Sequence, residues 1–153
     1  MMNHWTYKNQ TEFEIPEGAF GFVYQVTDPN GMKYIGRKYL TQSKTTSKRV
    51  LLKNGTKVTK KKKSRVESNW YSYMGSCKPL LERIEQVGKE KFKFEILAFG
   101  FTKGQVNFLE EFCQMNAGVM FKDEYYNDSV GARGFIGVKF TDEFKEVLRE
   151  IKI

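Results

Sequence analysis

Two strand-like segments joined by one turn constrain the fold of this chain more than any other feature. The residues before the turn are aromatic or β-branched, the residues after it alternate, and the Asp-Pro-Asn-Gly sequence at 28–31 is typical of a tight turn. Side chains alternate between the two faces of a strand, so Tyr34 shares its face with Gly36. The pattern predicts a β-hairpin over 20–38 in which Tyr24, Tyr34 and Gly36 line one surface.

The bulk composition fits one domain over residues 1–153. The chain is 40% hydrophobic and 15% aromatic, which is enough to fill one sizeable core. It has no run of 18 apolar residues and no apolar region near its N-terminus, so we expect no membrane span and no secretory signal. A cytoplasmic, intracellular protein is the expectation. In that setting Cys77 and Cys113 are expected to be reduced, and neither is assigned a function.

Positive charge is concentrated in one segment. Between Arg37 and Arg65 the sequence has twelve lysines or arginines and no acid, whereas the rest of the chain has 14 basic and 18 acidic residues. A segment of one charge sign is what a polyphosphate backbone selects, since each neutralised phosphate releases counterions. We therefore expect nucleic-acid contacts from this segment, made by Lys44, Lys48, Arg49, Lys53, Lys57, Lys60, Lys61, Lys62, Lys63 and Arg65.

A second interpretation of residues 39–65 is a solvated, mobile insertion. Within it, the apolar residues 50–52 and the segment 56–59 flank Asn54-Gly55 and could form a small second hairpin. The lack of acids argues against a purely solubilising role, because mixed charges serve solubility at least as well.

Helical periodicity predicts three helices. Ser76 as N-cap, Pro79 in the first turn and Gly88 at the end predict a helix over 77–87. A second helix is expected over 103–117, ended by Gly118, and a third over 141–153 that packs on the domain through Phe144, Val147, Leu148 and Ile151. The segment 130–139 between the last two is interrupted by glycines.

Residues 92–99 alternate and predict a third, largely buried strand. Residues 1–18 are expected to form an arm on the body, with a short edge strand as one option. The fold class is therefore α/β (α+β): a small, mainly antiparallel three-stranded sheet flanked by helices.

Glu110 lies at the edge of the apolar stripe of the second helix. At 100° per residue, Val106, Leu109, Cys113 and Ala117 cluster on one side, and Glu110 lies about 20° beyond them. Such an acid is either a functional carboxylate facing the core or a surface residue that pairs with a neighbouring helix.

Four motifs in order resemble the GIY-YIG nuclease family, in its phage-encoded, homing-type branch. They are Phe22-Val23-Tyr24 with Tyr34-Ile35-Gly36, Tyr73-x-Gly75-Ser76-x-Lys78-x-Leu80, Leu109-Glu110, and Tyr125-Tyr126-Asn127. The resemblance covers about residues 20–128. It implies a metal-dependent endonuclease that hydrolyses DNA phosphodiester bonds, in a phage-infected bacterial cell.

The resemblance also implies roles for individual residues. Glu110 would hold Mg²⁺ or Mn²⁺, Tyr24 with Tyr34 beside it would act as base or orient water, and Asn127 would hold the frame of the site, with Gly36, Gly75 and Ser76 as structural residues. A tyrosine with a pKa near 10 is a poor base at neutral pH. Neighbouring cations must therefore lower its pKa, or the water must be activated in another way.

Two features of the family have no counterpart here. The usual helical arginine about eight residues after the glycine is missing, and the single histidine, His4, precedes the hairpin. The charge directed at phosphate would then come from Arg37, Lys38, Lys78 or Arg65.

Three functions remain open from the sequence. The first is the endonuclease, with weak sequence preference and nicking of one strand if it acts as a monomer, the favoured state. The second is a non-catalytic nucleic-acid-binding protein on the same fold. The third is an interaction domain whose lysines serve only solubility.

Overall fold

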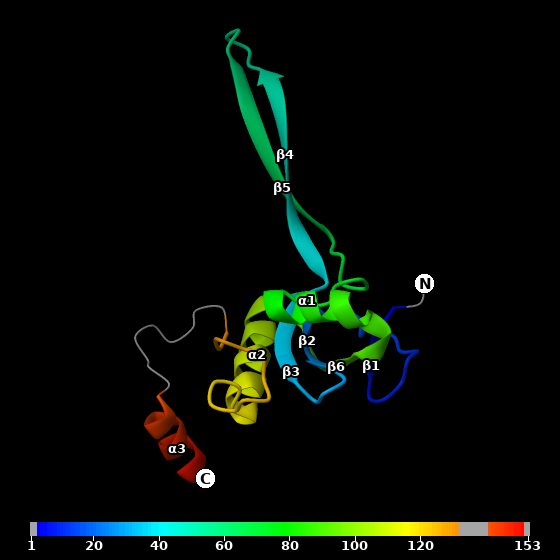
Figure 1. Ribbon diagram of the computed structural model, residues 1–153. Coiled ribbons are helices and arrows are strands. Elements are labelled where there is room, and N and C mark those ends of the chain that lie inside the picture. Colours follow the sequence, from blue (N-terminus) through cyan, green and yellow to red (C-terminus); the bar gives the residue numbers. More distant parts are fainter. Residues whose placement is uncertain (1–2, 132–140, 152–153) are drawn as a thin grey trace.

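The computed structural model of the chain describes residues 3–131 and 141–151 and contains a four-stranded sheet (Figure 1). The strands lie in the order β1 (Trp5–Tyr7), β6 (Lys93–Gly100), β2 (Gly21–Thr27) and β3 (Lys33–Tyr39). The β2–β3 and β2–β6 pairs are antiparallel, and β1 runs parallel to β6. The α+β class and the mainly antiparallel sheet are confirmed.

The N-terminal arm adds a fourth strand to the three expected in the sheet, as the short edge strand that the sequence left as an option. Trp5 anchors this strand because its side chain is fully buried and its indole Nε1 donates a hydrogen bond to the Trp70 carbonyl at 2.8 Å. The ring lies 5.2 Å from that of Phe22 and 5.1 Å from that of Tyr24. Burial of this large side chain holds the arm against β6.

The predicted hairpin forms with the expected turn. Asp28 is buried, and its Oδ1 accepts hydrogen bonds from the backbone N–H groups of Asn30 and Met32, both at 2.8 Å. Gly31 has a φ of 89°, which a residue with a side chain rarely adopts. This turn sets the register in which Tyr24 lies opposite Gly36.

The turn is also tied to the segment after the second helix. The Tyr126 hydroxyl donates to Asp28 Oδ2 at 2.7 Å. Burial and this hydrogen bond raise the pKa of Tyr126 from 10.0 to about 12. The raised pKa contributes stability that is complete below pH 10 and is lost as the pH rises toward 12.

We expect Tyr126→Phe to lower the free energy of unfolding by about 1 kcal/mol at neutral pH, because a hydrogen bond to a carboxylate is lost at a half-buried site. The difference between variant and wild type should shrink as the pH approaches 12. Urea unfolding of both proteins between pH 7 and about pH 12 measures this difference in the free energy of unfolding. A difference that stays constant up to pH 12 would contradict the role given to the hydroxyl.

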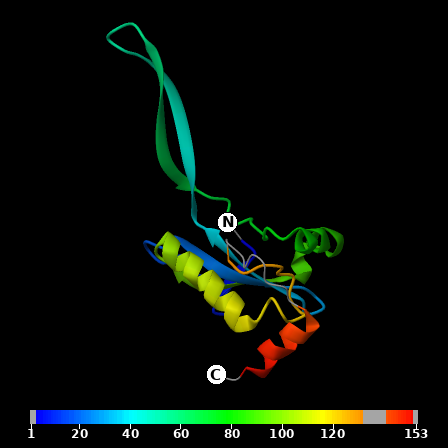
Figure 2. The ribbon, with the colours of Figure 1, turned by 90° about the vertical axis from the view of Figure 1, so that its left-hand side faces the viewer.

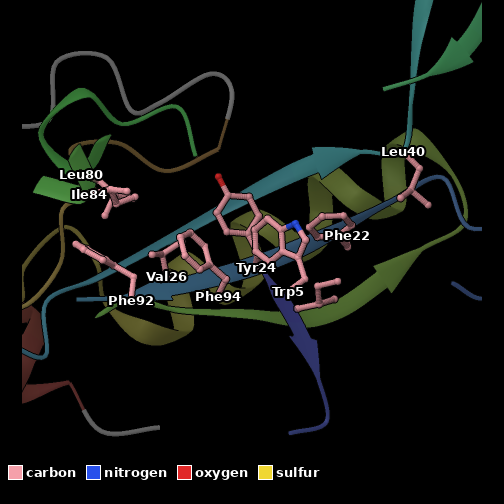
Figure 3. Close-up of a cluster of buried hydrophobic side chains, with 10 residues drawn as sticks. Trp5, Phe22, Tyr24, Val26, Leu40, Leu80, Ile84, Phe92 and Phe94 are labelled. Carbon is pink, nitrogen blue, oxygen red and sulfur yellow. The ribbon is translucent and has the colours of Figure 1, made fainter. Parts of the chain in front are cut away.

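Two helices cover the two faces of the sheet (Figure 2). On one face α1 (Lys78–Val87) contributes Leu80 and Ile84 to a cluster with Trp5, Phe22, Tyr24, Val26, Leu40, Phe92, Phe94 and Ile96. Figure 3 shows this cluster, with Trp5 and Phe22 beside Tyr24. On the other face α2 (Lys103–Ala117) packs Leu109, Cys113 and Ala117 against a smaller cluster of Val23, Ile35, Val119 and Val130.

The helix boundaries follow the predictions, with one exception. The N-cap of α1 is Cys77 instead of Ser76, and it makes no side-chain capping bond. The Ser76 hydroxyl lies 3.2 Å from the Tyr34 hydroxyl instead. At α2, Thr102 caps the start through a hydrogen bond from the Gln105 N–H, and Gly118 ends the helix at a φ of 70°. A short 3₁₀ turn (Lys89–Lys91) follows α1.

The basic segment is a long hairpin and not a small one. Strands β4 (Thr41–Leu51) and β5 (Lys57–Glu67) pair over their whole length and project from the body (Figure 1). The turn occurs at the predicted Asn54-Gly55, where Gly55 has a φ of 83°. β-branched residues give the strands β propensity, namely Thr41, Thr45, Thr46 and Val50 on β4 and Val58, Thr59 and Val66 on β5, and they extend the hairpin well beyond the apolar residues. We call this element, residues 41–67, the ribbon.

The predicted C-terminal helix forms over a shorter range than 141–153, as α3 (Asp142–Glu150). Arg149 donates a hydrogen bond to the Phe121 carbonyl at 2.8 Å, but Val147 and Ile151 are more than half exposed, so the expected packing through these two residues is wrong. Most of the glycine-interrupted segment before it, residues 132–140, lies outside the described residues. No helix in the described part of the chain is long and apolar enough to cross a membrane.

Candidate active site

A cleft of about 530 Å³ lies beside β3, which is the edge strand of the sheet. Because side chains alternate along β3, Tyr34 and Lys38 point to the face covered by α1, and Arg37 points to the face covered by α2. All three line the cleft, together with Tyr39, Arg65, Tyr73, Ser76, Lys103, Glu110, Gln114, Asn127, Asp128 and Ser129. The edge of the sheet is therefore where groups from both faces meet.

Glu110 and Arg37 form an ion pair in this cleft. Glu110 is only 7% exposed, which confirms the position at the edge of the core that the helical periodicity predicts. Burial alone would lower the pKa of Arg37, but the hydrogen bond and charge of Glu110 outweigh it and raise that pKa. Arg37 is thus a permanent cation at the site.

Hydrogen bonds on both sides hold this ion pair. Arg37 Nε donates to the Tyr39 hydroxyl at 3.2 Å, and that hydroxyl donates to Asn107 Oδ1 at 2.5 Å. Gln114 Nε2 donates to Glu110 Oε1 at 3.2 Å and to the backbone carbonyl of Ile35 at 2.9 Å. The two charges are therefore fixed relative to β3 and α2.

Lys38 is the second cation of the cleft. Its ammonium donates to Asn69 Oδ1 at 2.8 Å and lies 4.2 Å above the ring of Tyr73. Desolvation by burial lowers the pKa of Lys38. Arg65, at the base of the ribbon, also lines the cleft, and its guanidinium lies 4.8 Å from the centre of the Phe20 ring.

The two tyrosines lie at different depths. Tyr24 is fully buried beneath the site, and its hydroxyl occupies the space beside two glycines. A Cβ at Gly36 would come within 2.6 Å of that hydroxyl, and a Cβ at Gly75 within 3.6 Å. Tyr34 lines the cleft beside Ser76. The structural roles expected for these small residues are consistent with this packing.

Neither tyrosine has a lowered pKa. Burial raises the pKa of Tyr24 well above 10, and Tyr73 and Tyr34 beside it add to the effect. Burial also raises the pKa of Tyr34, against a hydrogen bond from Ser76 that lowers it. The packing around the two tyrosines thus favours the other option that the sequence left open, in which the water is activated without a tyrosine of lowered pKa. Both phenols are neutral at pH 7.

Asn127 extends the pairing of the edge strand. The segment before it pairs with Lys33, whose N–H donates to the Glu124 carbonyl at 2.8 Å and whose carbonyl accepts from the Tyr126 N–H at 2.7 Å. The Asn127 amide then takes both backbone groups of Ile35, accepting from its N–H at 3.0 Å and donating to its carbonyl at 2.8 Å. The side chain thereby supports β3 directly before Arg37.

Lys78 is the one candidate cation that the cleft leaves out. It is exposed at the start of α1 and is not among the lining residues. Conversely, Lys103, Gln114 and Asp128 line the cleft, although no motif in the sequence points to them. Gln114 had a detectable signal, since it lies one helical turn after Glu110 on the same side of α2.

The donor chemistry of the cleft fits a hard divalent cation with few protein ligands. The residues that the structure describes contain no group of three or more His, Cys, Asp or Glu side chains placed to hold a metal ion. Glu110 offers a carboxylate inside a cleft with room for waters and a phosphate, which is how Mg²⁺ is commonly held. Asp128 is a second, exposed carboxylate on the same cleft.

Comparison with known families identifies this fold. A family model described as "Putative endonuclease segE, GIY-YIG domain" matches residues 5–130, most of the chain. The chain belongs to the GIY-YIG nuclease family. No curated protein and no solved structure matches it.

The matched range shows which elements belong to the GIY-YIG domain. It begins at β1 and ends just after Asn127, so it includes the strand contributed by the arm and the ribbon, and it excludes α3. The match to a segE model also fits the phage-encoded, homing-type branch of the family that the motifs resemble. All the cleft residues named above lie within the matched range.

Proposed function

We propose that this protein is a metal-dependent endonuclease that hydrolyses DNA phosphodiester bonds, with Mg²⁺ or Mn²⁺ held by Glu110. The observation that carries the proposal is the cleft at the edge of β3, where one buried carboxylate and the cations Arg37 and Lys38 converge. Family membership supports nuclease chemistry in general. The cleft supplies the charges that such chemistry needs.

The cations of the cleft bind the scissile phosphate. Arg37 can offer a bidentate guanidinium to two phosphate oxygens, and Lys38 adds a point charge beside it. When bound, the divalent cation supplies Lewis-acid stabilisation of the charge that develops on the phosphate. Glu110 has a carboxylate directed into the cleft, and substrate phosphate competes with it for the Arg37 guanidinium.

The tyrosines orient water and do not deprotonate it. Because the pKa values of Tyr24 and Tyr34 are raised, both hydroxyls are neutral and can donate or accept hydrogen bonds at pH 7. Tyr34 reaches the cleft directly, whereas Tyr24 fixes the position of the strand around Gly36. The attacking water is then the nucleophile, and the proton it loses passes to bulk solvent instead of to a tyrosine phenolate.

The ribbon tracks the DNA backbone and provides affinity with weak sequence preference. Its side chains are almost all exposed, and its cations have no acidic neighbours until Glu67 at its end. Contacts to phosphate carry no sequence information. A monomer with one such cleft would cut one strand at a time.

Replacing the four consecutive lysines 60–63 with glutamine should weaken DNA binding and flatten its salt dependence. Each lost phosphate contact reduces the slope of log K against log salt by about 0.9, so a decrease of about 2–4 is expected. Gel-shift titrations over a range of salt concentrations measure the slope. A matched control replaces four exposed lysines outside the ribbon, Lys89, Lys91, Lys93 and Lys122. An equal change of this slope in the two variants would contradict the proposed contact between the ribbon and the DNA backbone.

The alternative is a non-catalytic nucleic-acid-binding protein on the same fold. The observation that favours it is the Arg37–Glu110 ion pair. Among the cleft residues that the structure describes, Glu110 is the only buried carboxylate, and its charge is neutralised by Arg37 without a metal ion. Supercoiled plasmid incubated with the protein and Mg²⁺, or with EDTA, separates the two functions. Relaxed plasmid in Mg²⁺ alone supports the endonuclease. Intact plasmid, at protein concentrations that shift its gel mobility, supports the alternative.

A further inference from the structure

The tip of the ribbon is apolar, although the shaft below it is strongly basic. The cross-strand pair Val50 and Val58 is half-buried, and beyond it Leu51 is 66% exposed and Leu52 is 36% exposed. Two hydrogen bonds between Leu52 and the turn shape this end, from the Leu52 N–H to the Thr56 carbonyl and from the Gly55 N–H to the Leu52 carbonyl. The tip that carries these exposed leucines is thus a closed turn, and Figure 1 shows that this end of the ribbon lies far from the body of the protein.

The shaft carries cations on both of its faces. Residues paired across an antiparallel ribbon share a face, and most rungs combine one cation with a serine or threonine, as in Thr45–Lys63 and Thr46–Lys62. These two rungs are adjacent, so their lysines point to opposite faces. A flat anionic surface would need cations on one face only. Cations on both faces fit a partner that surrounds the ribbon, as the two phosphate walls of a duplex groove do.

The ribbon projects from the body of the protein and contacts it at its base, where Arg65 lies against Phe20. Its side chains are exposed along most of both strands, and a two-stranded hairpin by itself is marginally stable in water. Lys48 directly opposite Lys60 adds repulsion between like charges. A polyanionic partner removes this repulsion and covers the exposed strands.

The partner that covers the shaft also determines what can cover the tip. Phospholipid surfaces and nucleic acids both offer an apolar environment next to phosphates, but cations on both faces of the shaft favour a nucleic acid, whose apolar environment is its base stack. We propose that the ribbon follows a groove of duplex DNA and that Leu51 and Leu52 insert between adjacent base pairs, which unstacks them and bends the duplex. This inference rests on the proposed function, in which DNA is the partner.

The dimensions of the ribbon are consistent with this geometry. Each strand has eleven residues. At about 3.3 Å per residue they span about 35 Å, close to one turn of B-DNA. The base of the ribbon, at Arg65, lines the cleft, so the bend would lie about one helical turn from the scissile phosphate. An RNA duplex fits less well because its major groove is deep and narrow.

The test measures bending and binding in the same samples. A duplex of about 30 base pairs, labelled at its two ends for energy transfer, is titrated in EDTA so that it is not cut. Wild type is compared with the double variant Leu51→Ser, Leu52→Ser. The matched control is Leu97→Ser, a leucine that is 40% exposed on β6, outside the ribbon.

Wild type and the control should raise energy transfer equally, since apolar wedges of this kind bend DNA by about 20–90°. The double variant should bind within about threefold of wild type, because the phosphate contacts of the shaft remain, but should leave energy transfer at the value of free DNA. The fluorescence of a 2-aminopurine placed at the bend should increase with wild type and with the control, but not with the double variant.

Four results would overturn the proposal. Bending by the double variant would show that the leucines are not the wedge, and binding by wild type without bending would exclude a wedge altogether. Both leave the nuclease proposal intact, whereas no binding of duplex DNA by wild type would overturn both. Sedimentation provides the fourth result: self-association of wild type that the double variant loses, with unchanged bending, would assign the tip to a second copy of the chain.

Discussion

Replacing Glu110 with glutamine is expected to reduce plasmid cleavage in Mg²⁺ by about 10²–10³-fold or more, with DNA binding retained. The substitution keeps the size of the side chain and its ability to accept a hydrogen bond from Gln114, but removes the charge that holds a divalent cation. It also releases Arg37 from its ion pair, which leaves that cation available for phosphate. Relaxation of supercoiled plasmid over time, with a parallel gel shift, measures both effects.

Glu111→Gln is the matched control for this experiment. It removes the same charge from the adjacent residue of α2, whose side chain is exposed and does not line the cleft. Cleavage by this control should equal that of wild type. If Glu110→Gln cuts as fast as the control, Glu110 does not hold the metal and the proposed site is wrong. Thermal unfolding of both variants checks that any loss of cleavage is not a loss of folding.

Replacing Gly36 with alanine should impair both stability and cleavage. The new methyl group would lie 2.6 Å from the Tyr24 hydroxyl and 2.9 Å from Cε1 of Tyr34, closer than carbon atoms are found in proteins. Tyr24 is fully buried, so it can yield only by disturbing the cluster around Trp5 and Phe22. Overpacking of this kind lowers the free energy of unfolding by about 1–3 kcal/mol. Because the added methyl group displaces Tyr34, the rate of cleavage should fall by a larger factor than the affinity for DNA.

Gly104→Ala is the control for the effect of an added methyl group. The nearest atom to its Cβ would be Thr102 Oγ1 at 3.9 Å, so the methyl group has room. The position lies in the first turn of α2, where alanine favours the helix over glycine by up to about 1 kcal/mol. This variant should be at least as stable as wild type and should cut DNA normally. Equal stability of the two variants, in denaturant titrations, would contradict the close packing at Gly36.

Much of the fold follows from local patterns in the sequence. Turn residues at 28–31 and alternation on either side are enough to predict the β2–β3 hairpin, and the apolar stripe of α2 is enough to predict that Glu110 reaches the core edge. The position of Asn54-Gly55 predicts the turn of the ribbon, although not its length. Strand length depends on pairing between two exposed strands, which scattered threonines and valines support without an alternating apolar pattern.

Contacts between distant segments could not be predicted in this way. The β1 strand depends on burial of Trp5 against elements far along the chain, and the N-cap expected at Ser76 was wrong because Tyr34 engages that hydroxyl. The direction of the tyrosine pKa shifts also depends on burial. From sequence, Tyr24 and Tyr34 could be near cations or away from water, and only the packing around them decides.

The sequence by itself determined the hairpin with its two tyrosines, the acid on α2 and the family to which those motifs are similar, because each depends on periodicity or spacing within a short segment. Only the tertiary structure decided which cation accompanies the acid. Arg37 and Glu110 are 73 residues apart in sequence, and they meet because α2 packs along β3 at the open edge of the sheet. The same packing excludes Lys78, which lies at the exposed start of α1. Periodicity assigns a side chain to a face of its own element, but the packing of elements decides which faces meet.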